Sequence, residues 1–396
     1  MGQTKAASLP INRGFNTDFG YLGGAEDHYT NENGGCGSCG KHVDLWRDHG
    51  PATGENGTGY SAHVWNDEAV RLIKGHAGDA KPWFMYLALQ CAHAPNEPDY
   101  FANLYSNASH TQDYIDYNGM ISAVDSTVGN VTSVLKGTRQ WNNTLLVFTS
   151  DNGGPAGASV SGESANNYPL RGGKHTAWEG GHRVLAFVTG GLLPPAMRGK
   201  KLEGYVHCAD WYVTFARLAG VDPTDDQPGF PSVDGIDQWP YLTGQVAKSA
   251  RTELPLASRS ANHEDVNGTD PQGGSAALIV GDYKLVRFAQ QYAIWMGPNY
   301  PNASTGGPGR PYEPVFDCGS AGCMFNIIED PGEHLDLAKD PKYAATLAKL
   351  QARARALDLT AIEAIKPTGW RHQNDQSLAC EVMQKNGGIW GPTQPK

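Results

Sequence analysis

The stretch that most constrains the fold is the apolar, β-branched run at residues 144–150, which ends abruptly in Asp151-Asn152-Gly153-Gly154. Such a run predicts a buried strand that delivers a carboxylate and an amide to a glycine turn. In open α/β sheets ligands bind just beyond the carboxyl ends of the strands, so Asp151 and Asn152 are site candidates. Their oxygens are the ligand type that Ca²⁺ or Mg²⁺ prefers. The alternative is that these four residues only form a turn.

Two further patterns precede this strand along the chain. Residues 82–90 predict a second, near-continuous apolar strand that leads toward His93. Residues 113–136 repeat apolar side chains at steps of three and four, which is typical of an amphipathic helix. A strand, a helix and a strand in this order predict a crossover unit with parallel strands, so we expect His93 and Asp151 to emerge at the same edge of the sheet.

The rest of the chain carries the patterns of further helices and strands. Helices are predicted at residues 61–74, at 209–218 and from 340 onward, and strands at 184–188, 276–280, 283–288 and 324–328. A stretch rich in Pro and Asp leads toward a domain boundary near residue 250. We therefore predict an α/β domain over residues 1–250 and a smaller α+β domain, with antiparallel strands and a long helix, over residues 251–396.

Composition and charge exclude several classes of function. The chain has 396 residues, and its formal net charge of −10 argues against a nucleic-acid partner. No apolar run approaches the roughly 18 residues of a membrane-spanning helix, so we expect no membrane span. The first five residues lack the apolar core of a signal peptide, and none is visible in this sequence.

The chain contains more glycosylation sequons than we expect in a cytosolic enzyme. The Asn-x-Ser/Thr pattern occurs at Asn56, Asn107, Asn130, Asn142, Asn267 and Asn302. Any one of these sites carries little weight alone. Together they predict a glycoprotein with a secreted or lysosomal history.

The cysteines fit the same environment. Cys36 and Cys39 sit in one glycine-rich loop, and Cys318 and Cys323 bracket another. Two local disulfides are the favoured interpretation, because the pairs lie far apart in a chain marked by sequons. The alternative is a zinc site with four cysteine ligands.

The other three cysteines carry weaker signals. Cys91 and Cys208 lie in apolar surroundings and are predicted to be inert core thiols. Cys380, near the end of the chain, has no obvious partner. An odd cysteine in a secreted protein indicates that its partner lies elsewhere.

A glycine-rich loop with several cations follows the turn at Asp151. It spans residues 166–183 and contains Arg171, Lys174 and two histidines. Such a cluster suits an anionic ligand. The alternative, a solvated charged loop, is equally consistent with the residues alone.

Read together, these motifs resemble the animal arylsulfatases, and most closely the arylsulfatase B type (N-acetylgalactosamine-4-sulfatase). The matching motifs follow the family's order at residues 14–21, 87–95, 128–132, 141–144, 151–154, 169–174, 178–181 and 389–392. The resemblance covers the chain almost from end to end. It implies an alkaline-phosphatase-like α/β sandwich with a mixed, mostly parallel central sheet and a small C-terminal α+β domain.

The resemblance also implies roles for individual residues. Asp151 and Asn152 would be ligands of a catalytic Ca²⁺, and His93 would contact the sulfate or assist proton transfer. Lys174 would bind sulfate oxygens and offset charge in the transition state, and Arg171 would help to bind the substrate. The family hydrolyses sulfate esters of small molecules or glycans, with a metal-held hydrate of formylglycine as the nucleophile.

The sequence departs from the family at its nucleophile. The family's formylglycine comes from the cysteine of a Cys-x-Pro-x-Arg segment upstream of the motif that begins here at Gly14, and this chain has no such segment. Cys91 lacks the Pro and Arg that should follow it. The upstream aspartate pair that completes the calcium site is also absent, so Asp151 and Asn152 supply only part of the six to eight oxygens that Ca²⁺ takes. These gaps indicate an N-terminally truncated sulfatase.

Three functions are consistent with these features. The first is a sulfuric ester hydrolase of the arylsulfatase type, whose activity needs residues that this chain lacks. The second is a catalytically dead protein that binds sulfated glycans, and the third is a phosphodiesterase or phosphonate hydrolase of the same superfamily. The loops at residues 262–274 and 297–314 are predicted to shape the substrate rim, but neither the substrate nor the oligomeric state can be read from the sequence.

Overall fold

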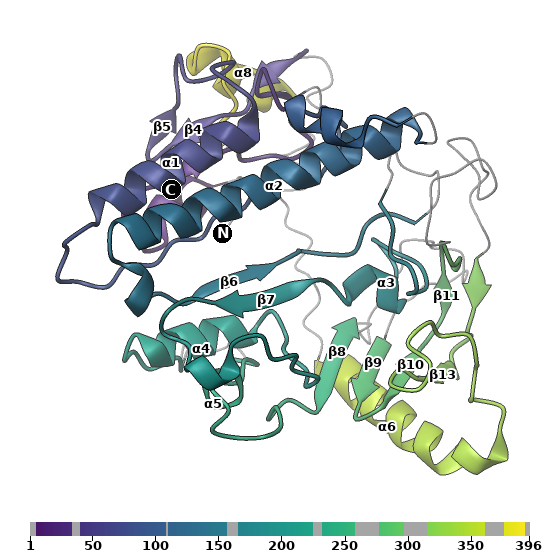
Figure 1. The fold of residues 1–396 in the computed structure, drawn as a ribbon. Helices are drawn as coiled ribbons and strands as arrows, with labels where there is room; N and C mark the ends of the chain where they lie inside the picture. The colour runs from purple at the N-terminus through teal and green to yellow at the C-terminus, as the bar shows by residue number, and fades with distance from the viewer. Residues whose placement is uncertain are drawn as a thin grey trace.

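The computed structural model describes residues 5–33, 40–107, 110–156, 165–224, 232–257, 277–296, 315–360 and 376–392. Two long helices lie across one side of the molecule, and a two-stranded ladder runs beneath them (Figure 1). A C-terminal sheet with its own helix lies beyond the far end of that ladder (Figure 1). The chain therefore mixes helices and strands throughout, as predicted.

The two long helices are α1 (Ser61–Gly75) and α2 (Gln112–Gly137), which confirms both predicted helices. α2 begins where the hydroxyl of Thr111 accepts a hydrogen bond from the backbone N–H of Tyr114, at 3.3 Å. The helices pack against each other. Their buried apolar side chains include Trp65, Ala69, Ile73, Met120, Ala123 and Leu135.

The central ladder joins β6 (Leu146–Thr149) to β7 (Ala186–Thr189). The strands are antiparallel, with Leu146 opposite Thr189 and Thr149 opposite Ala186. The rings of Phe148 and Phe187 stack across the ladder with centroids 5.0 Å apart. Both strands were predicted, and β6 ends two residues before Asp151.

The predicted strand at residues 82–90 is wrong, and with it the parallel pairing. This segment joins no ladder, and all the ladders between described strands are antiparallel. Its side chains still alternate: Trp83 stacks on His76 of α1 at 5.6 Å, while Phe84 and Tyr86 are 57% and 70% exposed. An apolar run shows which side chains can be buried, but a strand also needs a paired neighbour for its backbone groups, and no ladder joins this segment to a described strand.

The C-terminal sheet has four antiparallel strands in the order β13-β10-β9-β8. They are β8 (Glu253–Ala257), β9 (Ala277–Val280), β10 (Tyr283–Val286) and β13 (Cys323–Asn326). Tyr283 pairs with Val280 around the turn at Gly281, whose φ of +56° favours glycine. This confirms the predicted hairpin.

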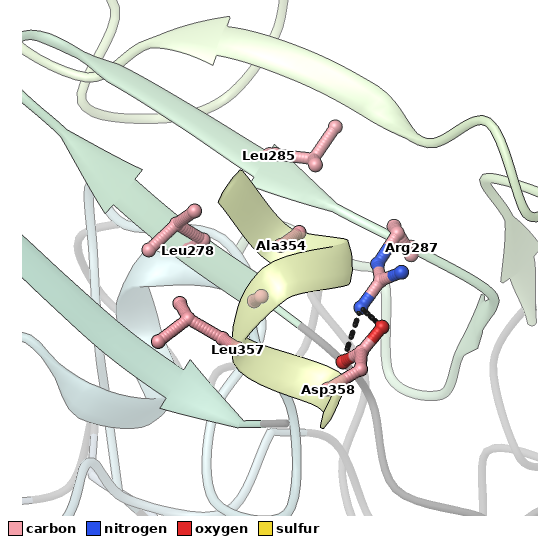
Figure 2. A pocket seen from close by; sticks show the side chains of 7 residues that line it. Leu278, Leu285, Arg287, Ala354, Leu357 and Asp358 are labelled. Carbon is pink, nitrogen blue, oxygen red and sulfur yellow. Dashed lines mark hydrogen bonds and ion pairs between the residues drawn. The ribbon is translucent and has the colours of Figure 1, made fainter. Parts of the chain in front are cut away.

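Helix α6 (Ala344–Thr360) packs on β9 and β10 of this sheet. Its first turn is a 3₁₀ turn capped by Asp340, whose side chain accepts a hydrogen bond from the backbone N–H of Lys342. Figure 2 shows a small pocket between α6 and the sheet, where Arg287 forms an ion pair with Asp358 at 2.7 Å. None of the residues that line this pocket belongs to the predicted site.

The shorter elements complete the described chain. The remaining strands are β1 (Phe19–Gly20), β2 (Glu32–Asn33), β3 (His42–Val43), β4 (Trp46–Arg47), β5 (Gly50–Pro51), β11 (Ala289–Gln290) and β12 (Phe316–Asp317). The remaining helices are α3 (Glu179–His182), α4 (Asp210–Leu218), α5 (Trp239–Leu242) and α8 (Gln376–Lys385). The predicted helix at residues 209–218 corresponds to α4.

The last part of the chain returns to its first part. After α8, Ile389 forms a parallel bridge with Val43, and the ring of Trp390 lies 4.9 Å from the ring of His42. Figure 1 shows α8 beside β4 and β5, away from the C-terminal sheet. The division at residue 250 stays a prediction, and residues 376–392 pack on the N-terminal side of it.

A buried ion pair spans the predicted boundary. Arg251 donates hydrogen bonds to both carboxylate oxygens of Asp210, which is fully buried on α4. Burial acts to raise the pKa of Asp210, but the hydrogen bonds from Arg251 and from the backbone N–H groups of His207 and Ile236 together lower that pKa. The two parts of the chain are thus joined by a charged contact in the interior.

Candidate functional site

Three glycine-containing segments meet at the end of β6. The backbone N–H of Gly153 donates to the carbonyl of Gly181 at 3.0 Å, and that of Lys174 donates to the carbonyl of Gly154 at 3.0 Å. We call the segments 151–154, 171–174 and 179–182 the glycine junction. This junction brings the predicted metal ligands and the predicted sulfate-binding lysine into one cluster.

The junction requires glycine because the backbones approach so closely. A Cβ atom on Gly153 would lie 1.7 Å from the carbonyl oxygen of Gly180. One on Gly173 would lie 2.2 Å from the carbonyl oxygen of Gly154, and one on Gly180 would lie 2.4 Å from that of Gly172. No side chain fits at these distances, so the glycines fix the geometry of the loops.

Asn167 ties two of the segments together. Its side-chain oxygen accepts from the N–H of Gly154 at 2.9 Å, and its side-chain nitrogen donates to the carbonyls of Gly154 and Gly172, at 2.7 and 2.9 Å. Sequence reasoning missed this residue. The signal was only an asparagine in a loop, and such residues commonly bond to nearby backbone groups.

Asp151 and Asn152 are placed where a ligand could reach them. Asp151 is exposed, and one of its carboxylate oxygens accepts from the backbone N–H of Asn152 at 2.8 Å. Across the described parts of the chain, no group of three or more His, Cys, Asp or Glu side chains is arranged to hold a metal ion. The pair has the donor chemistry for Ca²⁺, but not the number of oxygens that the ion needs.

Lys174 is half-buried at the junction. Its backbone is fixed by Gly154, whereas its ammonium makes neither a hydrogen bond nor an ion pair with the described residues. A cation held in place by its backbone but left unpaired is suited to bind an anion. The placement is compatible with the predicted role.

Arg171 is placed differently from Lys174. It is only 4% exposed, and its guanidinium lies 3.7 Å from the ring centroid of Trp178, 4.3 Å from that of Trp295 and 4.7 Å from that of Phe316. Burial lowers the pKa of Arg171 to about 10. The guanidinium therefore contacts aromatic rings rather than solvent, which argues against the predicted contact with substrate.

His93 lies at the end of the segment 82–90. Its ring is exposed and bonds to the carbonyl of Ala94 at 2.8 Å, while its own carbonyl contacts the buried His28 at 3.1 Å. In the described structure, no hydrogen bond joins His93 to Asp151 or Lys174. The expected convergence of His93 with the junction stays a prediction.

One residue links the two regions electrostatically. Burial raises the pKa of Tyr21 to about 12, and the nearby charges of Glu26, Asp44, Cys91 and Asp151 add to this shift. Tyr21 is therefore within electrostatic reach of both Cys91, two residues before His93, and Asp151.

The cysteines follow the predictions only in part. Cys318 and Cys323 form the predicted disulfide, so a zinc site built from four cysteines is excluded. Cys91 has its pKa raised to about 11 by burial and lies 3.3 Å from the hydroxyl of Tyr60, as expected of an inert thiol. Cys208 is exposed, so its prediction as a core thiol is wrong: it follows His207 in the turn before α4.

Some of the remaining cysteines and sequons lie within the described residues, and others lie outside them. Cys380 is disulfide-bonded, so it has a partner elsewhere in the chain, although none was obvious from the sequence. The described sequon asparagines are all exposed, as glycosylation requires, and they are Asn56, Asn107, Asn130 and Asn142. Cys36, Cys39, Asn267, Asn302 and the loops at 262–274 and 297–314 lie outside the described residues.

A buried cluster of charged residues lies next to the junction. The ammonium of Lys284 lies 2.7 Å from a carboxylate oxygen of Glu333, 3.0 Å from one of Glu179 and 3.0 Å from a ring nitrogen of His182. Lys284 and Glu333 are fully buried. The backbone N–H of Glu179 also donates to Glu333 at 2.7 Å. The cluster anchors α3, and through it the junction, to β10 of the C-terminal sheet.

The charge states in this cluster follow from burial and from Lys284. Burial acts to raise the pKa of Glu179, but Lys284 together with His182 and Arg183 lowers that pKa. Burial raises the pKa of Glu333. Burial and then Lys284 lower the pKa of His182 to about 3, so the imidazole is neutral. Sequence reasoning missed the cluster because Lys284 lies 105 positions from Glu179 and 102 from His182.

Comparisons with known proteins agree with the fold. Residues 2–221 match the family model described as Sulfatase. Arylsulfatase J of Mus musculus is 30% identical over 99% of this chain, and N-acetylgalactosamine-6-sulfatase of Canis lupus familiaris is 31% identical over 49% of it. The matches cover 63% and 35% of those relatives, so the chain spans less than two thirds of their length.

Solved structures show the same likeness. The crystal structure of Ps i-CgsB in complex with k-i-k-neocarrahexaose has a TM-score of 0.66 at 23% identity, covering 94% of this chain and 74% of that one. The PsFucS1 sulfatase from Pseudoalteromonas sp. has a TM-score of 0.65 at 24% identity, covering 88% of this chain and 66% of that one.

These matches confirm the predicted fold class, an α/β fold of the alkaline-phosphatase-like type. No helix in the described parts of the chain is long and apolar enough to cross a membrane. A family model matches residues 2–221, and a relative is 30% identical over 99% of this chain. The chain therefore belongs to the sulfatase family.

Proposed function

We propose that this chain provides the sulfate-binding part of a sulfuric ester hydrolase of the arylsulfatase type. The observation that carries the proposal is the glycine junction, which joins the turn at Asp151 and Asn152 to the backbone of Lys174, a cation that makes no ion pair with the described residues. Membership of the sulfatase family supports the same activity. We also propose that the enzyme is of the arylsulfatase B type and that it holds a Ca²⁺ ion.

Each residue would have a distinct task. Lys174 would bind the sulfate oxygens and stabilise the charge that develops on them. His93 would donate a proton to the leaving oxygen, as an exposed imidazole can. Asp151 and Asn152 would contribute to a Ca²⁺ site that needs further oxygen ligands, and the ion, when bound, would polarise the sulfate group.

The nucleophile is the part of the reaction to which the described residues do not contribute. Cys91 is the one cysteine close to His93 in sequence, but its pKa of about 11 keeps it protonated at neutral pH. We therefore expect activity to depend on a formylglycine-bearing segment in addition to these residues. The substrate would be a sulfated small molecule or glycan, met in a lysosomal or extracellular compartment, as the exposed sequons favour.

Sulfate binding tests the site without requiring turnover. We expect inorganic sulfate to bind the full chain, and Lys174→Ala to weaken that binding about tenfold, because one charge-assisted hydrogen bond contributes about 1.5–3 kcal/mol. Isothermal titration calorimetry measures both. Lys200→Ala, which removes an exposed cation outside the junction, is the matched control. Equal affinity in all three proteins would contradict the assignment of Lys174.

Turnover tests the reaction itself. Sulfate release from 4-nitrocatechol sulfate is measured with this chain and with a version extended upstream by a Cys-x-Pro-x-Arg segment, both co-expressed with the formylglycine-generating enzyme. We expect activity only in the extended protein, and its loss on Asp151→Asn. If the short chain turns over substrate alone, our view of the nucleophile is wrong.

A second candidate function is a protein that binds sulfated glycans without hydrolysing them. The raised pKa of Cys91 and the incomplete set of metal ligands favour it. Sulfate affinity in the extended protein without turnover would support it. A phosphodiesterase or phosphonate hydrolase is a weaker candidate, because the matching family model is that of the sulfatases.

A further inference from the structure

We propose that the surface formed by Trp295, His334 and Tyr168 is a subsite that binds a sugar ring of a glycan substrate beside Lys174. The inference rests on the proposed function and deepens it, because it favours a sulfated glycan over a small aryl sulfate. These three aromatic residues lie outside the catalytic roles assigned above.

The subsite is the outer end of a stack that begins in the core. The ring of Trp178 is fully buried and the guanidinium of Arg171 covers it at 3.7 Å. Arg171 also lies 4.3 Å from the ring of Trp295, and the ring of His334 stacks on Trp295 with centroids 4.6 Å apart and planes within 9°. Burial falls steadily along this stack, since Trp295 is 41% exposed and His334 is exposed.

Backbone and side-chain contacts hold the outer rings rigidly. The indole N–H of Trp295 donates to the carbonyl of Gly332 at 2.5 Å, and Arg171 and Trp295 are joined by an antiparallel bridge. His334 directly follows Glu333, which the buried ion cluster fixes through Lys284. Rings that are ordered before binding lose little conformational entropy when a ligand arrives.

The third aromatic side chain of the surface belongs to a segment that adjoins His334. Tyr168 is 54% exposed and precedes Pro169. A Cβ atom on Gly332 would meet both the ring of His334 and the carbonyl oxygen of Pro169, at 2.7 and 3.3 Å, so the two segments adjoin. Single exposed aromatic residues need no explanation, but several exposed rings on adjoining segments are typical of a binding site.

The location connects the surface to the sulfate-binding lysine. Arg171 contributes to the stack, and Lys174 follows it by three residues, which span at most about 11 Å of chain. The N–H of Gly172 donates to the carbonyl of Ile294 at 2.9 Å, so the loop of Lys174 and the strand of Trp295 are bonded side by side.

The chemistry of the surface selects the ligand class. Aromatic faces pack against the apolar C–H faces of pyranose rings, while the imidazole of His334 can bond to hydroxyl groups. A small aryl sulfate that reaches Lys174 has no second ring to place here. An oligosaccharide can bind Lys174 through its sulfate and the aromatic surface through a neighbouring sugar.

Binding measurements with the full chain test this subsite. The probes are a κ-carrageenan hexasaccharide, a chondroitin 4-sulfate hexasaccharide and inorganic sulfate, each followed by titration calorimetry. We expect at least one hexasaccharide to bind about tenfold more tightly than sulfate. Trp295→Ala should remove that tenfold gain and leave the affinity for inorganic sulfate unchanged, and His334→Ala should weaken hexasaccharide binding about threefold.

Controls separate the subsite from the fold and from the proposed function. Trp295→Phe keeps an aromatic face and should restore most of the affinity, and Tyr212→Ala, which removes a 54% exposed ring on α4, should change nothing. If Trp295→Ala fails to fold, His334→Ala decides the outcome. Hexasaccharides that bind no better than sulfate, or that bind both variants like the wild type, would overturn the subsite alone. A chain that binds neither sulfate nor hexasaccharide overturns the proposed function as well.

Discussion

The C-terminal sheet and the central ladder are built from similar strands in different surroundings. In the C-terminal sheet, β9, β10 and β13 are almost entirely buried, and Leu285 and Met324 are fully so. In the ladder of β6 and β7, no residue is fully buried, and Leu185 beside it is 72% exposed.

This difference shows what an apolar, β-branched sequence does and does not determine. Both regions have the composition of buried strands, but among the described elements the C-terminal sheet has four paired strands with α6 packed on them, whereas the ladder has two strands. The junction after β6 is therefore held by backbone contacts among glycines and by the ion cluster, rather than by a deep sheet core. Four experiments test this difference between the two regions.

The largest effect is expected from the ion cluster. Lys284→Met leaves the carboxylates of Glu179 and Glu333 buried without their cation, which should cost about 3–5 kcal/mol of unfolding free energy. Urea unfolding measures the change. Lys349→Met, on the exposed side of α6, is the control and should stay within about 0.5 kcal/mol. A loss below about 1 kcal/mol for Lys284→Met would show that the cluster does not support the junction.

Two leucines compare the regions directly. Leu285→Ala in the C-terminal sheet removes a fully buried side chain and should cost about 2–5 kcal/mol, whereas Leu185→Ala beside β7 should change stability by less than about 0.5 kcal/mol. The difference is read from thermal or urea unfolding. Similar losses at both positions would mean that the central ladder is as well covered as the C-terminal sheet.

Glycine substitutions test the tight packing of the junction. Gly153→Ala places a methyl group 1.7 Å from the carbonyl of Gly180 and should cost about 1–3 kcal/mol. Gly129→Ala on α2 meets no atom within 4 Å and should stabilise the protein by about 0.5–1 kcal/mol. If Gly153→Ala were neutral, the close approach of these backbones would not be needed.

The smallest effect concerns acidic pH. The folded protein keeps His182 neutral down to about pH 3, while the unfolded chain protonates it near pH 6.5, so the unfolded state binds more protons between these values. Stability should therefore fall as the pH falls, by about 1 kcal/mol from pH 6.5 to 5.5 for this group. The groups that face it are Lys284, Glu179 and Arg183.

Comparison with His182→Asn isolates this contribution, because the other titrating groups are retained. The variant should lose about 1 kcal/mol less than the wild type over the same interval, and His110→Asn at an exposed position should not. An identical pH dependence in the wild type and His182→Asn would mean that the imidazole titrates normally.

The sequence predicted the elements whose cause is local. The periodicity of α1 and α2 and the hairpin at Gly281 follow from residues close together in the chain. These features depend on apolar spacing and on glycine, which a sequence displays directly.

The features that the sequence did not predict depend on distant residues. In the sequence Lys284 looks like an ordinary residue of a strand, because Glu179, which contacts it in the structure, lies 105 positions away. Arg171 reads as a substrate contact until Trp295 and Phe316 are seen around its guanidinium. Residues 82–90 were expected to form a ladder because their own pattern cannot show whether a partner strand is present.

The bridge between Val43 and Ile389 joins two segments that lie more than 340 residues apart in the sequence. The chain must close a very long loop to make this contact, and contacts of such long range form slowly in folding. The rest of the N-terminal region is covered by nearby residues, because Leu45 and Ala52 pack with Trp65 of α1. We therefore expect the N-terminal strands to fold against α1 first and the contact with Ile389 to form later.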